Sequence, residues 1–273
     1  MRKVGTAFHE TMKLRRTNLT QVLKCVSDGV TDRETIYRRT SLGANEAKTA
    51  PAYLRCCGLI DWENRITLFG KMAIEKDHFL SSAKTEWLIH YHMCAPHCAG
   101  PGFWGDIVRK HFIALGEPLD FELIVQDINT YITEFENKEI NYNTVKSSAN
   151  IFLKAYSELD GLGGLEILRE EQPQTYLVGT PVEIPWRVMA YVLADFWEAN
   201  WGPTLSVPHA QLNGNDGPAV LMLLNSGQMG QLLKPMQEAG LVEVNRVTRP
   251  WTVVRKWPSK DALLEAVYAD HTA

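Results

Sequence analysis

Metal-ligating side chains are concentrated in one short stretch, HYHMCAPHC, which spans residues 90–98. Histidine and cysteine are common ligands of tetrahedral zinc, but one short stretch would have to supply every ligand, which is not the spacing of a zinc finger. On a helix, His90 and Cys94 share a face whereas His92 points elsewhere. We therefore expect core packing, with the cysteines as small buried residues, rather than a metal site. The residues concerned are His90, His92, Cys94, His97 and Cys98.

A second candidate for chemistry is the pair His9-Glu10, which has acid–base potential and is followed by Arg15. We expect this motif to anchor the N-terminal arm instead, through a helix cap or a salt bridge to Arg15 or Arg16. The glycine-rich stretch at 161–164 lacks the Gly-Lys-Ser/Thr ending of a phosphate loop. No Rossmann fingerprint, Walker motif or two-metal carboxylate set is recognised, so the sequence predicts neither an enzyme nor a cofactor.

Charge is distributed unevenly along the 273 residues, although the formal net charge is only -4. Residues 1–56 hold eleven Lys or Arg and five Asp or Glu, a net charge of +6. Residues 117–171 hold four basic and twelve acidic residues, a net charge of -8, and residues 245–257 hold four basic residues without an acid. Two basic segments around an acidic middle indicate a polyanionic partner, with an ordinary solvated surface as the alternative.

The N-terminal elements follow a recognisable order of three short helices and a hairpin. We expect helices over about 18–27, 31–39 and 45–57, the second opened by the capping box of Thr31 and Glu34. Gly58 can take a left-handed cap, and residues 59–69 then predict two short strands around a turn. This order is that of a winged helix-turn-helix unit. Pro51 conflicts with it, because proline inside a helix predicts a kink or a later start.

The same arrangement recurs, since Gly240-Leu-Val ends a helix and opens a hairpin as Gly58-Leu-Ile does. The fold class predicted is mainly α with small β-hairpin wings, built from tandem winged helix-turn-helix-like units. The domains expected are residues 1–84, 85–180 and 181–273. The further elements expected are helices over 85–95, 103–115, 119–135, about 141–159, 184–200, 226–240 and 260–269, and hairpins over 164–179 and 241–256.

Side chains that such units would expose form the candidate DNA-binding set, because Asn can read adenine edges while Lys and Arg can hold phosphates or guanine. Trp251 can pack or stack beside the last four. Asn143 and Lys146 of the middle segment lie among acids, so a protein contact is favoured there. The alternative for the whole set is a dimerisation or scaffold module. The DNA-binding candidates are Arg33, Asn45, Lys48, Thr49, Arg55, Asn64, Arg65, Arg246, Arg249, Arg255 and Lys256.

Five stretches spread over the chain carry a resemblance to a known family: FHETMKLR, AYLRCCGLI, TEWLIHYHM, NTVKSSANIFLKAY and VMAYVLADFW. In this order they resemble the bacterial domain-of-unknown-function family numbered four thousand and seven. Ala7 and Phe8 stand where that family has glycine before the histidine. The resemblance implies a setting beside phosphoadenosine-phosphosulfate-reductase-like genes, in DNA phosphorothioation and phage-defence islands.

The residues and the resemblance together predict a non-catalytic DNA-binding adaptor of a phosphorothioation or phage-defence system. Two alternatives stay open: a protein-interaction scaffold subunit of the same machinery, or a transcriptional regulator of the locus. The partners expected are double-stranded DNA and other subunits of the machinery, and a homodimer is compatible with the sequence. No apolar run of membrane-spanning length and no signal peptide is found, and five cysteines form no secreted framework, so we expect a cytoplasmic protein.

Overall fold

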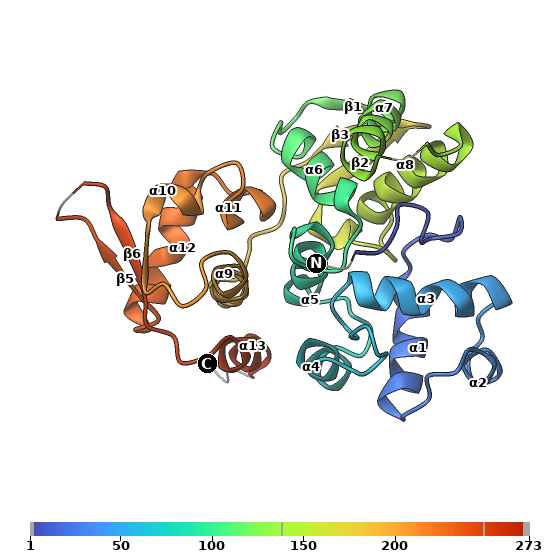
Figure 1. Cartoon of the computed structure of the whole chain (residues 1–273), viewed down its shortest axis with the longest axis horizontal. Helices are drawn as coiled ribbons and strands as arrows, with labels where there is room; N and C mark the ends of the chain where they lie inside the picture. Colours follow the sequence, from blue (N-terminus) through green and yellow to red (C-terminus); the bar gives the residue numbers. More distant parts are fainter. Residues whose placement is uncertain (1–2, 138, 248, 270–273) are drawn as a thin grey trace. The chain divides into compact units, whose positions relative to one another are not determined.

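The structure is a computed structural model that describes residues 3–137, 139–247 and 249–269. The chain divides into two compact units, Met1–Val182 and Glu183–Ala273. In the part of the chain that is described, helices predominate, and the named strands form two three-stranded antiparallel sheets (Figure 1). The expectation of a mainly α protein with small β-hairpins is thus confirmed. No helix among these residues is long and apolar enough to cross a membrane.

The first unit opens with the three predicted helices, but their caps differ from those expected. α1 begins two residues before Asn18, because Asp160, distant in sequence, accepts from the Thr17 backbone N–H at 3.0 Å. α2 is capped by Asp32 rather than Thr31, since the Asp32 carboxylate accepts from the Thr35 N–H at 2.8 Å. The bounds are α1 Arg16–Ser27, α2 Arg33–Arg39 and α3 Ala44–Cys56.

Pro51 lies inside α3, which starts at Ala44 and continues past it, so the expectation of a later start is wrong. Gly58 ends the helix as predicted, with a φ of +74° and a hydrogen bond from the Leu59 N–H to the Leu54 carbonyl at 2.9 Å.

The predicted hairpin over 59–69 is reduced to one β-bridge between Ile60 and Ile66. The returning strand fails because Thr67 caps a helix, accepting from the Gly70 N–H at 3.0 Å. The residues expected to complete the strand therefore begin α4, Leu68–Lys76.

The helix that follows α4 is α5, Ala83–Cys94, which packs against α3 and α6 and has most of its side chains buried. The predicted 164–179 hairpin is confirmed as β2 and β3, and a strand outside the prediction, β1, pairs with β3 to complete a sheet of order β1-β3-β2. The other elements are α6 Gly102–His111, β1 Pro118–Asp120, α7 Phe121–Tyr131, the π-helical η1 Ile132–Glu136, α8 Tyr142–Ser157, the 3-10 turn η2 Gly163–Leu165, β2 Leu168–Gln172 and β3 Thr175–Val178.

The second unit is built on α9, Trp186–Asn200, which packs against α12 and α13. Every residue of α9 from Val188 to Trp197 is buried, and the sheet order is β4-β6-β5. The elements are β4 Ser206–Pro208, α10 His209–Leu212, α11 Pro218–Leu221, α12 Ser226–Glu238, β5 Val242–Asn245, β6 Thr252–Arg255 and α13 Lys260–Tyr268.

The two sheets occur in the same order of elements. In the first unit, α6 is followed by β1, the helices α7 and α8, and the hairpin β2–β3; in the second, α9 is followed by β4, helices ending with α12, and the hairpin β5–β6. In both sheets the last strand lies in the middle and pairs with the other two antiparallel. The segments from α6 to β3 and from α9 to β6 therefore share both the order of their elements and the order of strands in the sheet.

Candidate nucleic-acid interface

The basic hairpin of the second unit begins where α12 ends. Gly240 has a φ of +70°, and the Leu241 N–H donates to the Met236 carbonyl at 2.9 Å, the same closure as at Gly58. The chain then enters β5, which pairs with β6 from Val242 opposite Arg255 to Asn245 opposite Thr252. The loop between the strands is thereby held at the end of a short ladder (Figure 1).

Two arginines of this loop carry charge that nothing neutralises within the described part of the chain. Arg246 and Arg249 are both exposed, and neither forms an ion pair with a described residue. The Arg246 guanidinium lies 5.7 Å from the centroid of the Trp251 ring, which holds the cation without cancelling its charge. These two side chains are therefore suited to an anionic ligand.

The other two predicted cations of the hairpin are partly engaged. Lys256 pairs with Glu243 across the strands at 3.1 Å, and Arg255 donates to the Pro203 carbonyl at 3.3 Å. A carboxylate beside Lys256 lowers its attraction for phosphate, whereas Arg255 keeps its charge and has one of its N–H groups occupied by the carbonyl.

A polar face of α12 was not among the predicted contacts. Gln228, Gln231, Lys234 and Gln237 are all exposed, while Met229, Leu233 and Met236 of the same helix are buried. These polar residues recur every three positions and alternate with apolar residues of the same helix. This pattern in the sequence could have predicted a polar face. Gln and Lys side chains at the surface of a helix can contact base edges and phosphates.

Two predicted contacts of the first unit, Lys48 and Arg65, are engaged by acids. Lys48 pairs with Glu10 at 2.5 Å, and the Arg65 guanidinium reaches Asp61 at 2.7 Å. Thr49 is 3% exposed, and its hydroxyl donates to the Asn45 carbonyl at 3.0 Å. The expectation that Thr49 lies at the surface is wrong, because it falls on the buried face of α3.

The rest of this set stays near the surface. Arg33 and Asn45 are exposed, and Arg33 donates to the Ala44 carbonyl at 3.2 Å. Arg55 hydrogen-bonds the side chain of Asn64 and lies 5.8 Å from the centroid of the Trp62 ring. The structure thus brings Arg55 and Asn64 together, and Arg33 stays exposed without an ion pair to a described residue.

The N-terminal motif anchors the arm, by contacts other than those expected. His9 is 2% exposed; its Nε2 lies 2.9 Å from the Ser148 hydroxyl, and its Nδ1 accepts from the Thr11 N–H at 3.0 Å. Ser148 donates to the Thr144 carbonyl, so the His9 ring carries its proton on Nε2. Burial lowers the pKa of His9 to about 4. Glu10 pairs with Lys48 rather than with an arginine, and Arg15 is exposed at the N-cap of α1.

Aromatic side chains engage the first members of the His/Cys stretch. The Trp104 indole N–H donates to the Tyr156 hydroxyl at 2.9 Å, and that hydroxyl lies 2.9 Å from Nδ1 of the buried His90. Cys94 Sγ lies 3.7 Å from the same hydroxyl, and burial raises the pKa of this thiol to about 12. These two residues belong to a buried polar network.

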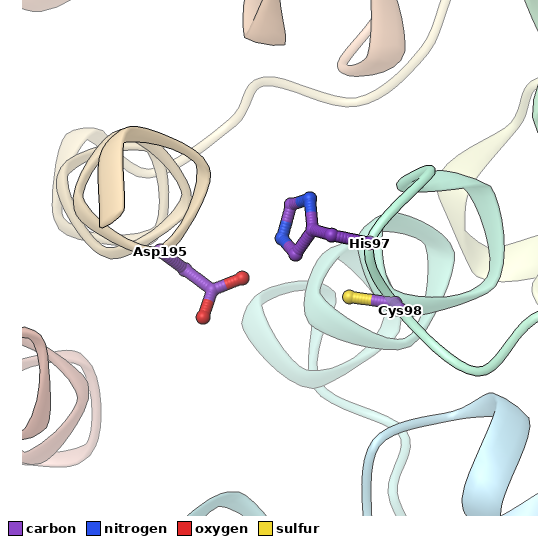
Figure 2. A group of neighbouring side chains, drawn as sticks. All are labelled: His97, Cys98 and Asp195. Atoms are coloured by element: carbon purple, nitrogen blue, oxygen red, sulfur yellow. The ribbon is translucent and has the colours of Figure 1, made fainter. Parts of the chain in front are cut away.

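The later members have a different set of partners. His92 stacks on Phe69 with ring centroids 5.5 Å apart, and Cys98 Sγ lies 3.4 Å from His92 Nδ1. His97 Nε2 lies 3.2 Å from the Tyr91 hydroxyl. Figure 2 shows His97 and Cys98 on the segment that follows α5. It also labels Asp195, a residue of α9 in the second unit that pairs there with Lys260 at 3.0 Å.

Comparison with known proteins places the chain in a family. The sequence profile described as "Protein of unknown function (DUF4007)" matches residues 7–268, which is most of the chain. The chain belongs to the DUF4007 family. No curated protein matches this DUF4007 chain.

Two solved structures resemble the DUF4007 chain in fold. A magnesium ion-bound SspB crystal structure matches with a TM-score of 0.75 and 14% sequence identity, covering 96% of this chain and 86% of that one. A second SspB crystal structure matches with a TM-score of 0.74 and 15% identity over the same shares. At this identity the likeness concerns the fold alone.

Proposed function

We propose that this DUF4007 chain is a DNA-binding protein whose main contact is α12 with the β5–β6 hairpin. The observation that carries the proposal is the pair Arg246 and Arg249, exposed on one loop without an acidic partner among the described residues. Each guanidinium can replace a condensed counterion on one phosphate of the duplex, which is the main source of affinity in sequence-independent binding.

The topology of both sheets supports the same function. A helix, a short strand, two helical segments and a hairpin whose last strand is central are the parts expected of a winged helix-turn-helix unit. In such a unit the last helix before the hairpin enters the major groove. In the second unit this helix is α12, and it exposes three glutamines and a lysine. We interpret α6 to β3 and α9 to β6 as two such units.

The family resemblance supports a setting for this activity. We propose that the chain is a non-catalytic adaptor of a DNA-phosphorothioation or phage-defence system, where it places other subunits on duplex DNA. Transcriptional regulation of the same locus would use the same interface. In either case, binding by phosphate contacts falls steeply with salt.

The direct test is a titration of the purified chain against a labelled random-sequence duplex at 50 and 200 mM salt, by fluorescence anisotropy. We expect binding at the lower salt and strong weakening at the higher. Absence of binding at 50 mM would refute the function. Because an SspB crystal structure holds a magnesium ion, supercoiled plasmid is incubated in parallel with and without Mg²⁺. Nicked or linear product that depends on Mg²⁺ and on the chain would refute the non-catalytic part alone.

A second candidate function has its own observation, the exposed aromatic rings of the acidic segment 117–171 in the first unit. Phe135 is 70% exposed and stacks on Tyr131, and the 53% exposed Tyr142 donates to Glu122 at 3.1 Å. Exposed aromatic side chains within a segment whose net charge is -8 suit a basic protein partner. Stable co-purification with products of neighbouring genes, together with no DNA affinity at moderate salt, would favour this scaffold function.

A further inference from the structure

A shallow pocket opens beside the arginine-bearing loop of the second unit. It is lined by His209, Ala210, Arg249, Pro250 and Trp251. Its two sides are tied together, because the His209 backbone N–H donates to the Trp251 carbonyl at 2.8 Å and β4 pairs with β6. The pocket is therefore a product of the sheet rather than of two loops that happen to meet.

Two rings and a cation define what this pocket can hold. The Trp251 side chain is 40% exposed, and the His209 ring stands nearly perpendicular to it, with centroids 6.3 Å apart and planes at 70°. Arg246 lies over the indole ring but does not line the pocket, whereas Arg249 does. The pocket thus offers an aromatic wall, a cation and an imidazole edge to one ligand.

The imidazole is suited to hydrogen bonding rather than to charge. Burial lowers the pKa of His209, and the nearby Arg246 lowers it further, which favours the neutral ring. Asn213 Nδ2 donates to the His209 carbonyl at 3.1 Å and lies 3.5 Å from Nδ1 of the ring, and a neutral imidazole has one donor and one acceptor nitrogen in either tautomer. A neutral imidazole beside an aromatic wall can hydrogen-bond the donor and acceptor atoms on the edge of a nucleobase.

The ligand class follows from what a duplex can present. A flat heteroaromatic ring with hydrogen-bond acceptors and an attached anion is a nucleotide, and its ring face is free only when the base is unpaired. On the basis of the proposed DNA-binding function, we propose that this pocket holds an unpaired nucleobase, stacked on Trp251 with its phosphate at Arg249. The loop arginines then hold the duplex while the pocket recognises an interruption in it.

The test compares two labelled duplexes of one sequence, fully paired or with one extra unpaired adenine, by anisotropy at constant salt. We expect the chain to prefer the bulged duplex roughly 5- to 150-fold, the range of one base–aromatic stack. Trp251→Ala should abolish this preference, and Trp251→Phe should retain most of it. Taking the ratio of the two affinities cancels any effect of the substitution on Arg246. Trp186→Ala is the matched control, because Arg187 lies over Trp186 in the same unit, 4.6 Å from its ring centroid.

The outcomes separate this inference from the function on which it rests. Failure to bind either duplex would overturn the proposed function. Equal affinity of the wild-type chain for both duplexes would leave DNA binding intact and overturn the pocket assignment alone, as would a preference that survives Trp251→Ala. A competition arm with free adenosine monophosphate distinguishes the two sources of the base. Displacement of the bulged duplex by micromolar nucleotide would overturn the assignment to DNA in favour of a free nucleotide.

Discussion

Replacement of both loop arginines, Arg246→Ala with Arg249→Ala, should change how DNA affinity depends on salt. Each phosphate contact adds about 0.9 to the slope of log affinity against log salt, so losing two lowers the slope by about 1.8. Between 50 and 200 mM salt, the advantage of the wild-type chain over the variant should therefore shrink by about 12-fold. Neither guanidinium is buried or paired with a described acid, so the fold should be unaffected.

The assay is fluorescence anisotropy of a labelled duplex at four or more salt concentrations, for the wild-type chain, the double variant and a matched control. The control is Arg38→Ala with Arg169→Ala, two exposed arginines that already pair with Glu34 and Glu171. We expect the slope of the control to change by well under one unit. If the double variant and the control had the same slope, the loop arginines would not contact phosphate, and the reasoning from their missing acidic partners would be refuted.

Three further predictions concern stability, each measured by urea unfolding. Gly58→Ala and Gly240→Ala should each lower the free energy of unfolding by about 1–2 kcal/mol, because alanine is strained in the left-handed conformation. Gly58→Ala should lower it further, because its Cβ would lie 2.5 Å from the His92 ring, while that of Gly240 would meet open space. Equal losses would contradict this. The pKa of His9 is about 4 in the folded chain and about 6.5 in the unfolded chain, so the free energy of unfolding should fall by about 3 kcal/mol as the pH drops from 6.5 to 4. In His9→Gln this dependence of stability on pH should disappear. Arg16→Met removes the buried ion pair with Glu86 and should lower the free energy of unfolding by about 3–5 kcal/mol. Lys13→Met removes the more exposed pair with Glu158 and should lower it by about 0–1 kcal/mol. Similar losses would show that burial does not decide the strength of these two pairs.

Local chemistry made much of the fold predictable. The ends of α3 and α12 could be predicted because Gly58 and Gly240 need no partner beyond their own helix to adopt a left-handed conformation. The cap of α1 could not, because Asp160 lies far along the chain from Thr17. The first wing was over-predicted because Thr67 favours a helix start over a strand, a signal that the hydrophobic pattern of 66–69 concealed.

The sequence could predict which basic residues belong to the candidate site, but not which of them are paired with acids. Residue type alone placed Arg246 and Lys48 in one class, and the structure separates them, since Lys48 meets Glu10 and Arg246 meets an indole. Such pairings join residues far apart in sequence and depend on tertiary packing. The burial of Thr49 was missed for a related reason, because a helix with little hydrophobic contrast does not indicate which face turns inward.

The placement of the five thiols has a consequence for experiment. Cys25, Cys56, Cys57, Cys94 and Cys98 are all buried, and all lie in Met1–Val182. An alkylating reagent should therefore react with the native chain only as fast as this unit opens, in the way that amide exchange reports local unfolding. The second unit contributes no signal, because it has no cysteine. Labelling rates compared with a global probe would show whether the two units unfold as one cooperative body or in succession.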